Sequence, residues 1–349
     1  MKRILWPLIL SALIISVNAQ TNFTKYNGTG GPVLLKGAGE TFTDTTRWDF
    51  LTASDPEVVF YQDTFRLWYT SSSEMAGNYP YPRIGYAWSL DGISWTKYPA
   101  NSPVFSGTTG AWDSLSVESV SVLIDSSAPA SERYKMWYLG ENHVPSVDST
   151  LYWGIGYAWS ADGINWTKHP NPVIEADTSD WTIDRGSIQG PSVIKDGDTL
   201  RMYYAGFSVM FNLAPWDHHF NIIYAWSLDG INWNKKTDAP VLAVNPSQNW
   251  EDEFIQDPKV LKIGNTYHMW YGAKGSVQGG QQIGHASSND GISWVRSSTS
   301  PLLSNGRAGA WDDSLCSFPS VVYKDNVYHL WYTGSDLSLI HISEPTRPY

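Results

Sequence analysis

Short runs of aromatic and polar residues recur along the chain at intervals of about 60 to 70 residues. The pattern Ser-x-Asp-Gly-Ile-x-Trp is found at 89–95 and returns at 160–166, 227–233 and 288–294. A strand-like run rich in Trp and Tyr precedes each copy, at 66–69, 135–138, 201–204 and 268–271, and appears once more at 329–332. Self-similarity on this scale indicates a repeat architecture.

Each unit predicts four short strands. In the first unit they cover 58–61, 66–69, 84–88 and a stretch that begins at Trp95. The Asp-Gly pair between the third and fourth strands is typical of a tight hairpin turn. Four antiparallel strands repeated about five times predict an all-β fold, a five-bladed β-propeller.

The two ends of the repeat predict how the last blade is completed. The segment 22–26 followed by Pro32-Val33 matches 94–98 followed by Pro103-Val104. We therefore expect the mature N-terminus to supply the fourth strand of the last blade. The first two strands of that blade fall within 320–332, and its third strand is missing, so the last blade is predicted to be truncated at the C-terminus.

Both termini are predicted to lie outside the propeller, which we assign to residues 20–336. Residues 1–19 resemble a secretory signal peptide, with Lys2 and Arg3 before an apolar run and a small-residue cleavage site ending at Ala19. The apolar run is shorter than the roughly 20 residues of a membrane span. Residues 337–349 are predicted to be a non-native tail, because Leu337–Arg347 resembles a translated sequencing adapter.

Composition narrows the possible partners. The 23 basic and 34 acidic residues give a net charge of −11, which disfavours nucleic acid and anionic membranes as partners. Cys316 is the single cysteine and cannot form a disulfide within the chain. We expect a monomer, located outside the cell or in the periplasm, with no cofactor and no metal.

Most of the 19 tryptophans are explained by the repeat and are no evidence for a ligand. Sixteen occupy repeated positions and Trp6 lies in the predicted signal. Trp153 and Trp216 remain, and both are predicted to lie in long loops on one face of the propeller, where an aromatic ring can stack on a sugar. The alternative is that they only anchor those loops against a neighbouring blade.

The candidate catalytic residues stand at the start of the first strand of a unit, close to the predicted central axis. Asp55 and Asp257 directly precede a proline. Glu118 stands one residue before the equivalent position of the second unit. Carboxyl groups gathered around one funnel can separate into an acid and a base. The alternative is that each aspartate caps a turn before a strand.

Three further polar residues are candidates for substrate binding. Asp184 and Arg185 lie in a two-residue insertion of the third unit, near the predicted funnel, and could hold an anionic or hydroxyl-rich substrate or pair with each other. His143 lies in a predicted loop of the same face.

The runs 54–59, 65–70 and 84–89 together resemble the five-bladed propellers of glycoside hydrolase families 43 and 32. The resemblance implies a base aspartate in the Asp-Pro of the first blade, which is Asp55 here, with a second aspartate and an acid glutamate. The third blade has Gly190-Pro191 where a second Asp-Pro would be expected. The acid is therefore predicted to be Glu118 or Asp257.

This resemblance implies a secreted glycosidase that acts on plant or microbial polysaccharide or oligosaccharide, by inverting hydrolysis in analogy with family 43. One alternative is a non-catalytic, glycan-binding propeller. Sialidases are a weaker alternative, because their Asp-box has one more residue between Asp and Gly and they need an arginine cluster.

Overall fold

The structure is a computed structural model. It describes residues 9–15, 23, 25, 32–34, 48–49, 51–72, 75–76, 79–143, 151–176, 183–184, 187–207, 219–276 and 280–335. Within these ranges the chain is almost entirely β, with one short 3-10 helix at Ala130–Glu132. None of the helices in the described ranges has the length and apolar character needed to cross a bilayer.

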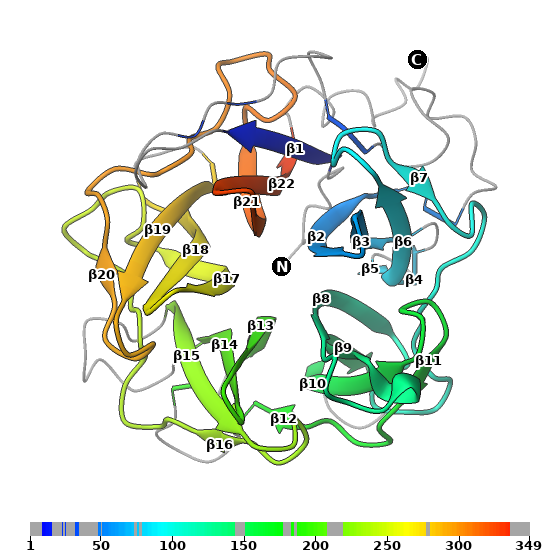
Figure 1. Ribbon diagram of the computed structural model, residues 1–349. Coiled ribbons are helices and arrows are strands. Elements are labelled where there is room, and N and C mark those ends of the chain that lie inside the picture. The colour runs from blue at the N-terminus through cyan, green and yellow to red at the C-terminus, as the bar shows by residue number, and fades with distance from the viewer. Residues whose placement is uncertain are drawn as a thin grey trace, which may run out of the picture.

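Four sheets of four principal strands are arranged around a common centre, as in a β-propeller (Figure 1). The first contains β2 (Ser54–Tyr61), β3 (Thr64–Ser71), β6 (Arg83–Ser89) and β7 (Thr96–Lys97). The second contains β8 (Ser116–Ile124), β9 (Tyr134–His143), β10 (Leu151–Ser160) and β11 (Trp166–Lys168), with β12 (Ile174–Glu175) also paired to β10. The all-β propeller arrangement predicted from the repeat is confirmed.

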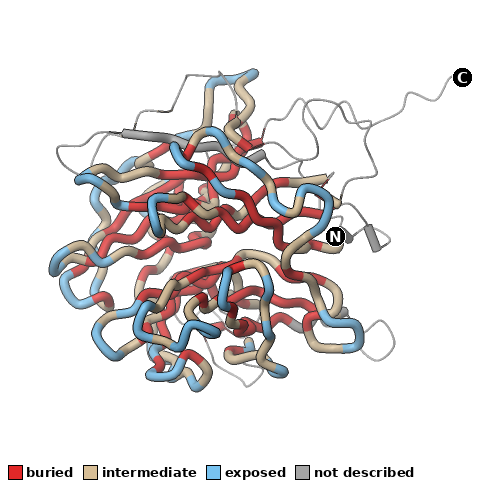
Figure 2. The backbone as a smooth tube through the Cα atoms, turned by 45° about the vertical axis from the view of Figure 1, so that its right-hand side comes forward, coloured by how far each residue is buried: buried red, intermediate tan, exposed pale blue. Residues whose placement is uncertain are grey.

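The third and fourth sheets repeat this order. They contain β13 (Ile188–Asp196), β14 (Thr199–Phe207), β15 (Phe220–Ser227) and β16 (Asn234–Lys235), then β17 (Phe254–Ile263), β18 (Thr266–Lys274), β19 (Gln282–Ser288) and β20 (Val295–Arg296). A two-stranded hairpin, β4 (Met75–Ala76) and β5 (Tyr79–Pro80), lies outside the blades. Buried residues follow the strands and exposed residues gather at the turns (Figure 2).

A three-stranded sheet lies between the fourth and first blades. It consists of β21 (Leu315–Lys324), β22 (Val327–Ser335) and β1 (Ile9–Ile15), and β21 packs against both β17 and β2. β1 falls in the predicted signal peptide, yet its backbone pairs antiparallel with β22, where the sequence predicts that a third strand is missing. Of the predicted fourth strand, the structure describes Phe23, which packs against this sheet, and Lys25.

Each of the four blades, and the three-stranded sheet, contributes a buried acid that joins three segments of the repeat. In the first blade, Asp49 accepts a hydrogen bond from Tyr69 and forms an ion pair with Lys97 at 2.5 Å. Equivalent sets occur at Asp113 with Tyr138 and Lys168, Asp184 with Tyr204 and Lys235, Glu251 with Tyr271 and Arg296, and Asp312 with Tyr332 and Lys25. In the four blades the acid thus ties the segment that opens the unit to its second and fourth strands, and Asp312 ties the corresponding segment to β22 and to Lys25.

This network includes one of the predicted site residues. Asp184 is 2% exposed, accepts a hydrogen bond of 2.9 Å from Tyr204 and pairs with Lys235 at 2.7 Å. It is the third unit's version of the structural acid, displaced along the sequence by the two-residue insertion after Trp181. Its carboxylate is buried and paired within this network, which indicates a structural role, and its predicted role in substrate binding stays a prediction.

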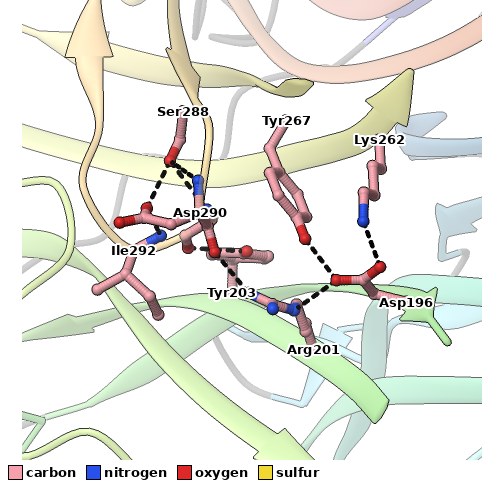
Figure 3. A network of polar contacts seen from close by, with 9 residues as sticks. Asp196, Arg201, Tyr203, Lys262, Tyr267, Ser288, Asp290 and Ile292 are labelled. Carbon is pink, nitrogen blue, oxygen red and sulfur yellow. Dashed lines mark hydrogen bonds and ion pairs between the residues drawn. The ribbon is translucent and has the colours of Figure 1, made fainter. Parts of the chain in front are cut away.

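The Asp-Gly turns join neighbouring blades. Within each turn the serine hydroxyl accepts from the glycine N–H at 2.9 Å, and the aspartate accepts from the two following N–H groups. Figure 3 shows the turn of the fourth blade against the third: Tyr203 donates to the carbonyl of Gly291 at 2.9 Å, and Arg201 donates to that of Asp290 at 2.8 Å. The turns are therefore structural, as the sequence predicts.

Asp184→Ala tests the structural role of the buried acid. The change removes the carboxylate that accepts from Tyr204 and pairs with Lys235, which keeps its hydrogen bond to the carbonyl of Glu175, so we expect a loss of roughly 2–4 kcal/mol in the free energy of unfolding. Urea denaturation measures this loss. As a control, Asp238→Ala removes an exposed partner of Lys236 and should change stability by less than about 0.5 kcal/mol. Equal effects of the two substitutions would contradict the structural role.

Candidate functional site

The innermost strand of every sheet changes register at one residue, and these residues surround the centre. Asp55 and Pro56 together face a single residue of β3, since Ser54 pairs with Thr70 and Glu57 pairs with Trp68. This is a β-bulge, which bends a strand and redirects a side chain. The same shift occurs in β8, β13, β17 and β21.

The bulge residue has a positive φ in all five strands. The residues are Asp55 (49°), Ser119 (48°), Gly190 (56°), Asp257 (51°) and Phe318 (56°). A left-handed backbone is unfavourable for most residues other than glycine, less so for aspartate and asparagine, and such strain is concentrated at functional sites. The four residues other than Gly190 are held in this conformation by the surrounding sheets, which fix each strand on both sides of the bulge.

Side chains of neighbouring sheets satisfy the N–H groups around the bulges. The hydroxyl of Ser320 accepts from the N–H of Val58 at 2.8 Å, and Glu57 accepts from that of Val122 at 2.9 Å. Two further serines continue the series. The hydroxyl of Ser121 accepts from the N–H of Val193 at 2.9 Å, and that of Ser192 accepts from the N–H of Val260 at 3.0 Å. The inner strands are thus linked blade to blade by side chain to backbone hydrogen bonds.

Lys259 interrupts this series because its ammonium group is a donor and cannot accept. It pairs instead with Glu57 at 2.6 Å, and both side chains are buried. The pair joins the fourth blade to the first across the centre. It places one positive and one negative charge beside the cavity described next, and these largely compensate each other.

A central cavity of about 40 Å³ lies among the bulges. Its lining includes Asp55, Ser119, Gly190, Asp257 and Phe318, together with the Glu57–Lys259 pair and the residue that follows each bulge. A space of this size holds one or two water molecules, and it is open to solvent on one side. Asp55 and Asp257 are the carboxyl groups on its wall that have no ion-pair partner among the described residues.

Asp55 is half-buried and held by hydroxyl groups. Its Oδ2 accepts from Ser119 at 2.9 Å, and its own N–H donates to Thr333 at 3.0 Å. Loss of water around the carboxyl raises its pKa to about 6, although hydrogen bonds from Ser119, Thr70 and Ser54 oppose the shift. Asp55 is therefore a carboxylate at neutral pH that can accept a proton.

Asp257 is more deeply buried, at 7% exposure, and its Oδ2 has no hydrogen-bond partner. Burial raises its pKa well above the usual range, and the nearby negative charge of Asp55 raises it further. Two interacting carboxyls whose proton affinities differ can divide into an acid and a base. Asp257 is the member of the pair that retains the proton.

Gly190 explains why the third blade has no acid at this position. A side chain there would begin 2.9 Å from Oδ1 of Asp257 and 3.1 Å from its Cα. Asp257 therefore occupies the space that a third-blade aspartate would need. The carboxyl group at this point of the cavity comes from the fourth blade.

The other predicted site residues are placed less centrally or not described. Glu118 is half-buried in β8 and is not among the residues that line the cavity, so the geometry favours Asp257 over Glu118 as the partner of Asp55. Trp153 lies in β10, not in a loop, and is 7% exposed within the core between the second and third blades. That placement corrects the prediction of an open stacking platform.

His143 ends β9, and its side chain lies outside the described part of the structure, as do Trp216 and Arg185 entirely. Their predicted roles in substrate binding stay predictions. No group of three or more His, Cys, Asp or Glu side chains suited to a metal ion occurs in the described ranges. The sequence signal for the Asp55–Asp257 pair was the Asp-Pro dipeptide, which these two units share.

Several solved structures of glycoside hydrolases have a similar fold. A putative glycoside hydrolase from Parabacteroides distasonis superposes with a TM-score of 0.66 at 15% identity, over 91% of this chain and 95% of the other. A thermostable family-43 glycoside hydrolase gives a TM-score of 0.58 at 18% identity, over 80% of this chain and 88% of the other. At these identities the similarity shows the fold.

Sequence comparison gives the family. Two uncharacterized proteins from strains of Mycobacterium tuberculosis are 29% identical over 146 residues, which is 40% of this chain and 46% of theirs, so the chain spans about half the length of these relatives. Residues 128–313, more than half of the chain, match the model of the glycosyl hydrolases family 32 N-terminal domain. That match includes Gly190 and Asp257 but neither Asp55 nor Glu118. The chain therefore belongs to the glycosyl hydrolase family 32 N-terminal domain family, with the propeller fold of glycoside hydrolases.

Proposed function

We propose that this protein is a secreted glycosidase that hydrolyses a plant or microbial polysaccharide or oligosaccharide. The observation that carries the proposal is the pair of carboxyl groups, Asp55 and Asp257, on the wall of one central cavity. Their environments favour opposite protonation states. Glycoside hydrolysis needs one carboxylate and one carboxylic acid on either side of the scissile bond.

In the proposed inverting mechanism, Asp55 is the base and Asp257 the acid. The Asp55 carboxylate removes a proton from a water molecule as that water attacks the anomeric carbon. Asp257 gives its proton to the leaving oxygen, and the glycosidic bond breaks with inversion. Each carboxyl then exchanges its proton with solvent. Ser119 holds Asp55 through a hydrogen bond and so fixes the direction of its free oxygen.

The size of the cavity supports this assignment of roles. Because the cavity holds one or two waters, the reacting water would occupy it, and the sugar would lie at its mouth. Asp55 is half-buried and so can be reached from that side. Binding of the sugar would exclude bulk water and strengthen the electrostatic contrast between the two carboxyls.

We also propose that the complete propeller has five blades, with the N-terminal segment as the outermost strand of the last blade. Lys25 supports this proposal: its 2.6 Å ion pair with Asp312 repeats the contact of Lys97 with Asp49. The hydrogen bond from Val58 to Ser320 supports direct contact between the last and first blades. Secretion, with cleavage after residue 19, is part of the same proposal.

A non-catalytic, glycan-binding propeller is the second candidate. The observation in its favour is Gly190, which replaces the second Asp-Pro expected of the hydrolase families. In that case Asp55 and Asp257 would hydrogen-bond sugar hydroxyls without transferring protons. The two candidates differ in what happens when a carboxyl becomes an amide, since an amide can bind a sugar but cannot act as base or acid.

Asp55→Asn is expected to abolish hydrolysis and to retain binding. Reducing-sugar release from arabinan, xylan, fructan and mannan identifies a substrate of the wild type, and the variant should release it at least about 10³-fold more slowly. Isothermal titration with the corresponding oligosaccharide should give a similar affinity for both proteins. No release by the wild type from any of these glycans, with binding intact, would favour the glycan-binding candidate.

The pH dependence of kcat/KM should follow the two carboxyls. Asp55 must be ionised, so kcat/KM should fall as the pH drops through about 6, the pKa to which burial raises this group. Asp257 must keep its proton, so a second decline is expected at higher pH. Asp257→Asn should remove the alkaline decline from whatever activity remains. An acidic limb centred below about pH 4.5, near the ordinary aspartate value, would contradict the assigned base.

Gly190→Ala should impair the site through direct contact with Asp257. The added Cβ would lie 2.9 Å from Oδ1 of Asp257, and we expect kcat/KM to fall at least about tenfold. Gly197→Ala is the matched control: Gly197 also has a positive φ, of 63°, but a Cβ there would meet nothing within 4 Å. Both variants should lose roughly 1 kcal/mol of stability, and only the first should lose activity. Unchanged activity in Gly190→Ala would contradict the crowding at Asp257.

A further inference from the structure

Asp55 and Asp257 occupy equivalent places in their sheets but have different neighbours. Both are bulge residues that directly precede a proline, and both line the central cavity. Two equivalent positions lie against each carboxyl group. One is on the second strand of the same sheet, and the other is the bulge residue of the sheet that follows in the chain. Around Asp55 both positions carry a hydroxyl group, whereas around Asp257 neither does.

Asp55 receives both hydroxyl groups. Ser119, the bulge residue of the second sheet, donates to Oδ2 of Asp55 at 2.9 Å. Thr70 lies on β3, where its backbone pairs with Ser54, and its hydroxyl also hydrogen-bonds to Asp55. The same hydroxyl accepts from the N–H of Ser119 at 3.1 Å, so the two partners of Asp55 hold each other in place. Hydrogen bonds to a carboxylate favour its ionised form.

Gly272 takes the place of Thr70 in the fourth sheet. It pairs with Gln256, the residue before Asp257, as Thr70 pairs with the residue before Asp55. A Cβ at Gly272 would lie 3.5 Å from Oδ2 of Asp257, so a side chain at this position would face that oxygen. The same oxygen has no hydrogen-bond partner among the described residues. Glycine at position 272 therefore leaves Asp257 without the donor that Thr70 gives to Asp55.

Phe318 takes the place of Ser119. It is the bulge residue of β21, which packs against β17 as β8 packs against β2. Its ring adds apolar surface to the cavity wall that it shares with Asp257, and it has no hydroxyl to donate. Its backbone φ of 56° is unfavourable for a bulky residue. An aromatic side chain is therefore kept at this position despite strain, which is typical of functional sites.

We propose that Gly272 and Phe318 fix the acid role of Asp257 by withholding the two hydroxyl groups that Asp55 receives. Both residues act through Asp257 and are positioning residues. Without these donors the ionised form of Asp257 is poorly stabilised, so the carboxyl group keeps its proton until the leaving oxygen takes it. The same bulge thus gives a base in the first sheet and an acid in the fourth.

The charged groups around Asp257 are few. Asp55, Glu57 and Lys259 line the cavity with it, and Glu57 and Lys259 pair with each other at 2.6 Å. Gln256 gives Asp257 a hydrogen bond that lowers its pKa, against the larger effect of burial. The neighbours that β13, β18 and β21 present are uncharged, namely Gly190, Gly272 and Phe318. Substitution at 272 or 318 therefore adds a donor without changing the charge of the site.

Phe318→Ser tests the position on β21. It adds the hydroxyl group that Ser119 gives to Asp55, and Phe318→Ala is the matched control, because it removes the ring without adding a donor. We expect the serine variant to hold the proton of Asp257 at least about tenfold more weakly than the alanine variant. Carbon-13 NMR titration of the aspartate carboxyl groups measures this difference without a substrate. The alkaline decline of kcat/KM should lie at lower pH in the serine variant by the same amount.

Gly272→Thr tests the position on β18. The hydroxyl of Ser317 fills the space beside Gly272, so the substitution is combined with Ser317→Ala. Gly272→Val with Ser317→Ala is the control, since valine has the shape of threonine and no hydroxyl. The threonine form should hold the proton of Asp257 at least about tenfold more weakly than the valine form. If this pair fails to fold, the Phe318 pair decides. Equal titration of Asp257 within either folded pair would overturn the proposal.

This proposal rests on the acid role of Asp257 in the proposed function, and the two can fail separately. If the titrations differ as expected but no glycan is hydrolysed, Gly272 and Phe318 still set the proton affinity of Asp257, and the proposed hydrolysis is what fails. If a glycan is hydrolysed and the paired variants titrate alike, the proposed hydrolysis stands and the role of Gly272 and Phe318 is refuted.

Discussion

The bulge at the start of each innermost strand is the constraint on which the rest of the site depends. It turns one residue into the left-handed region, so that this side chain faces the centre and not a neighbouring sheet. It also alters the local backbone pairing. Backbone N–H groups of the adjacent sheet then donate hydrogen bonds to the side chains of Ser320, Glu57, Ser121 and Ser192. One local distortion therefore both links the blades and forms the central cavity.

The proposed chemistry follows from which residues occupy that position. The five bulges bring four side chains and one glycine to one small space, and among these residues only Asp55 and Asp257 are ionisable. Their burial raises both pKa values, and their proximity separates them further, because ionisation of Asp55 disfavours ionisation of Asp257. Glycine at position 190 leaves room for the Asp257 carboxyl, which a larger residue would displace.

The repeat in the sequence was sufficient to predict the all-β propeller and the Asp-Gly turns. Asp184 was not recognised as a structural acid because an insertion moved it two residues from its tryptophan, and only the contact with Tyr204 reveals its equivalence. Trp153 was misassigned because strand β10 begins earlier than the repeat suggests. Neither the bulge nor the crowding of Gly190 by Asp257 could be predicted, because both depend on contacts between distant strands.

The central claim is that Asp55 and Asp257 share one cavity and differ in proton affinity. Carbon-13 NMR of the aspartate side-chain carboxyls, assigned with Asp55→Asn and Asp257→Asn, measures this directly across the pH range. The structure predicts that Asp55 titrates near pH 6 and Asp257 above it, with the Asp257 titration moving down in Asp55→Asn. Titration of both groups near the ordinary aspartate value, each unaffected by removal of the other, would contradict the account.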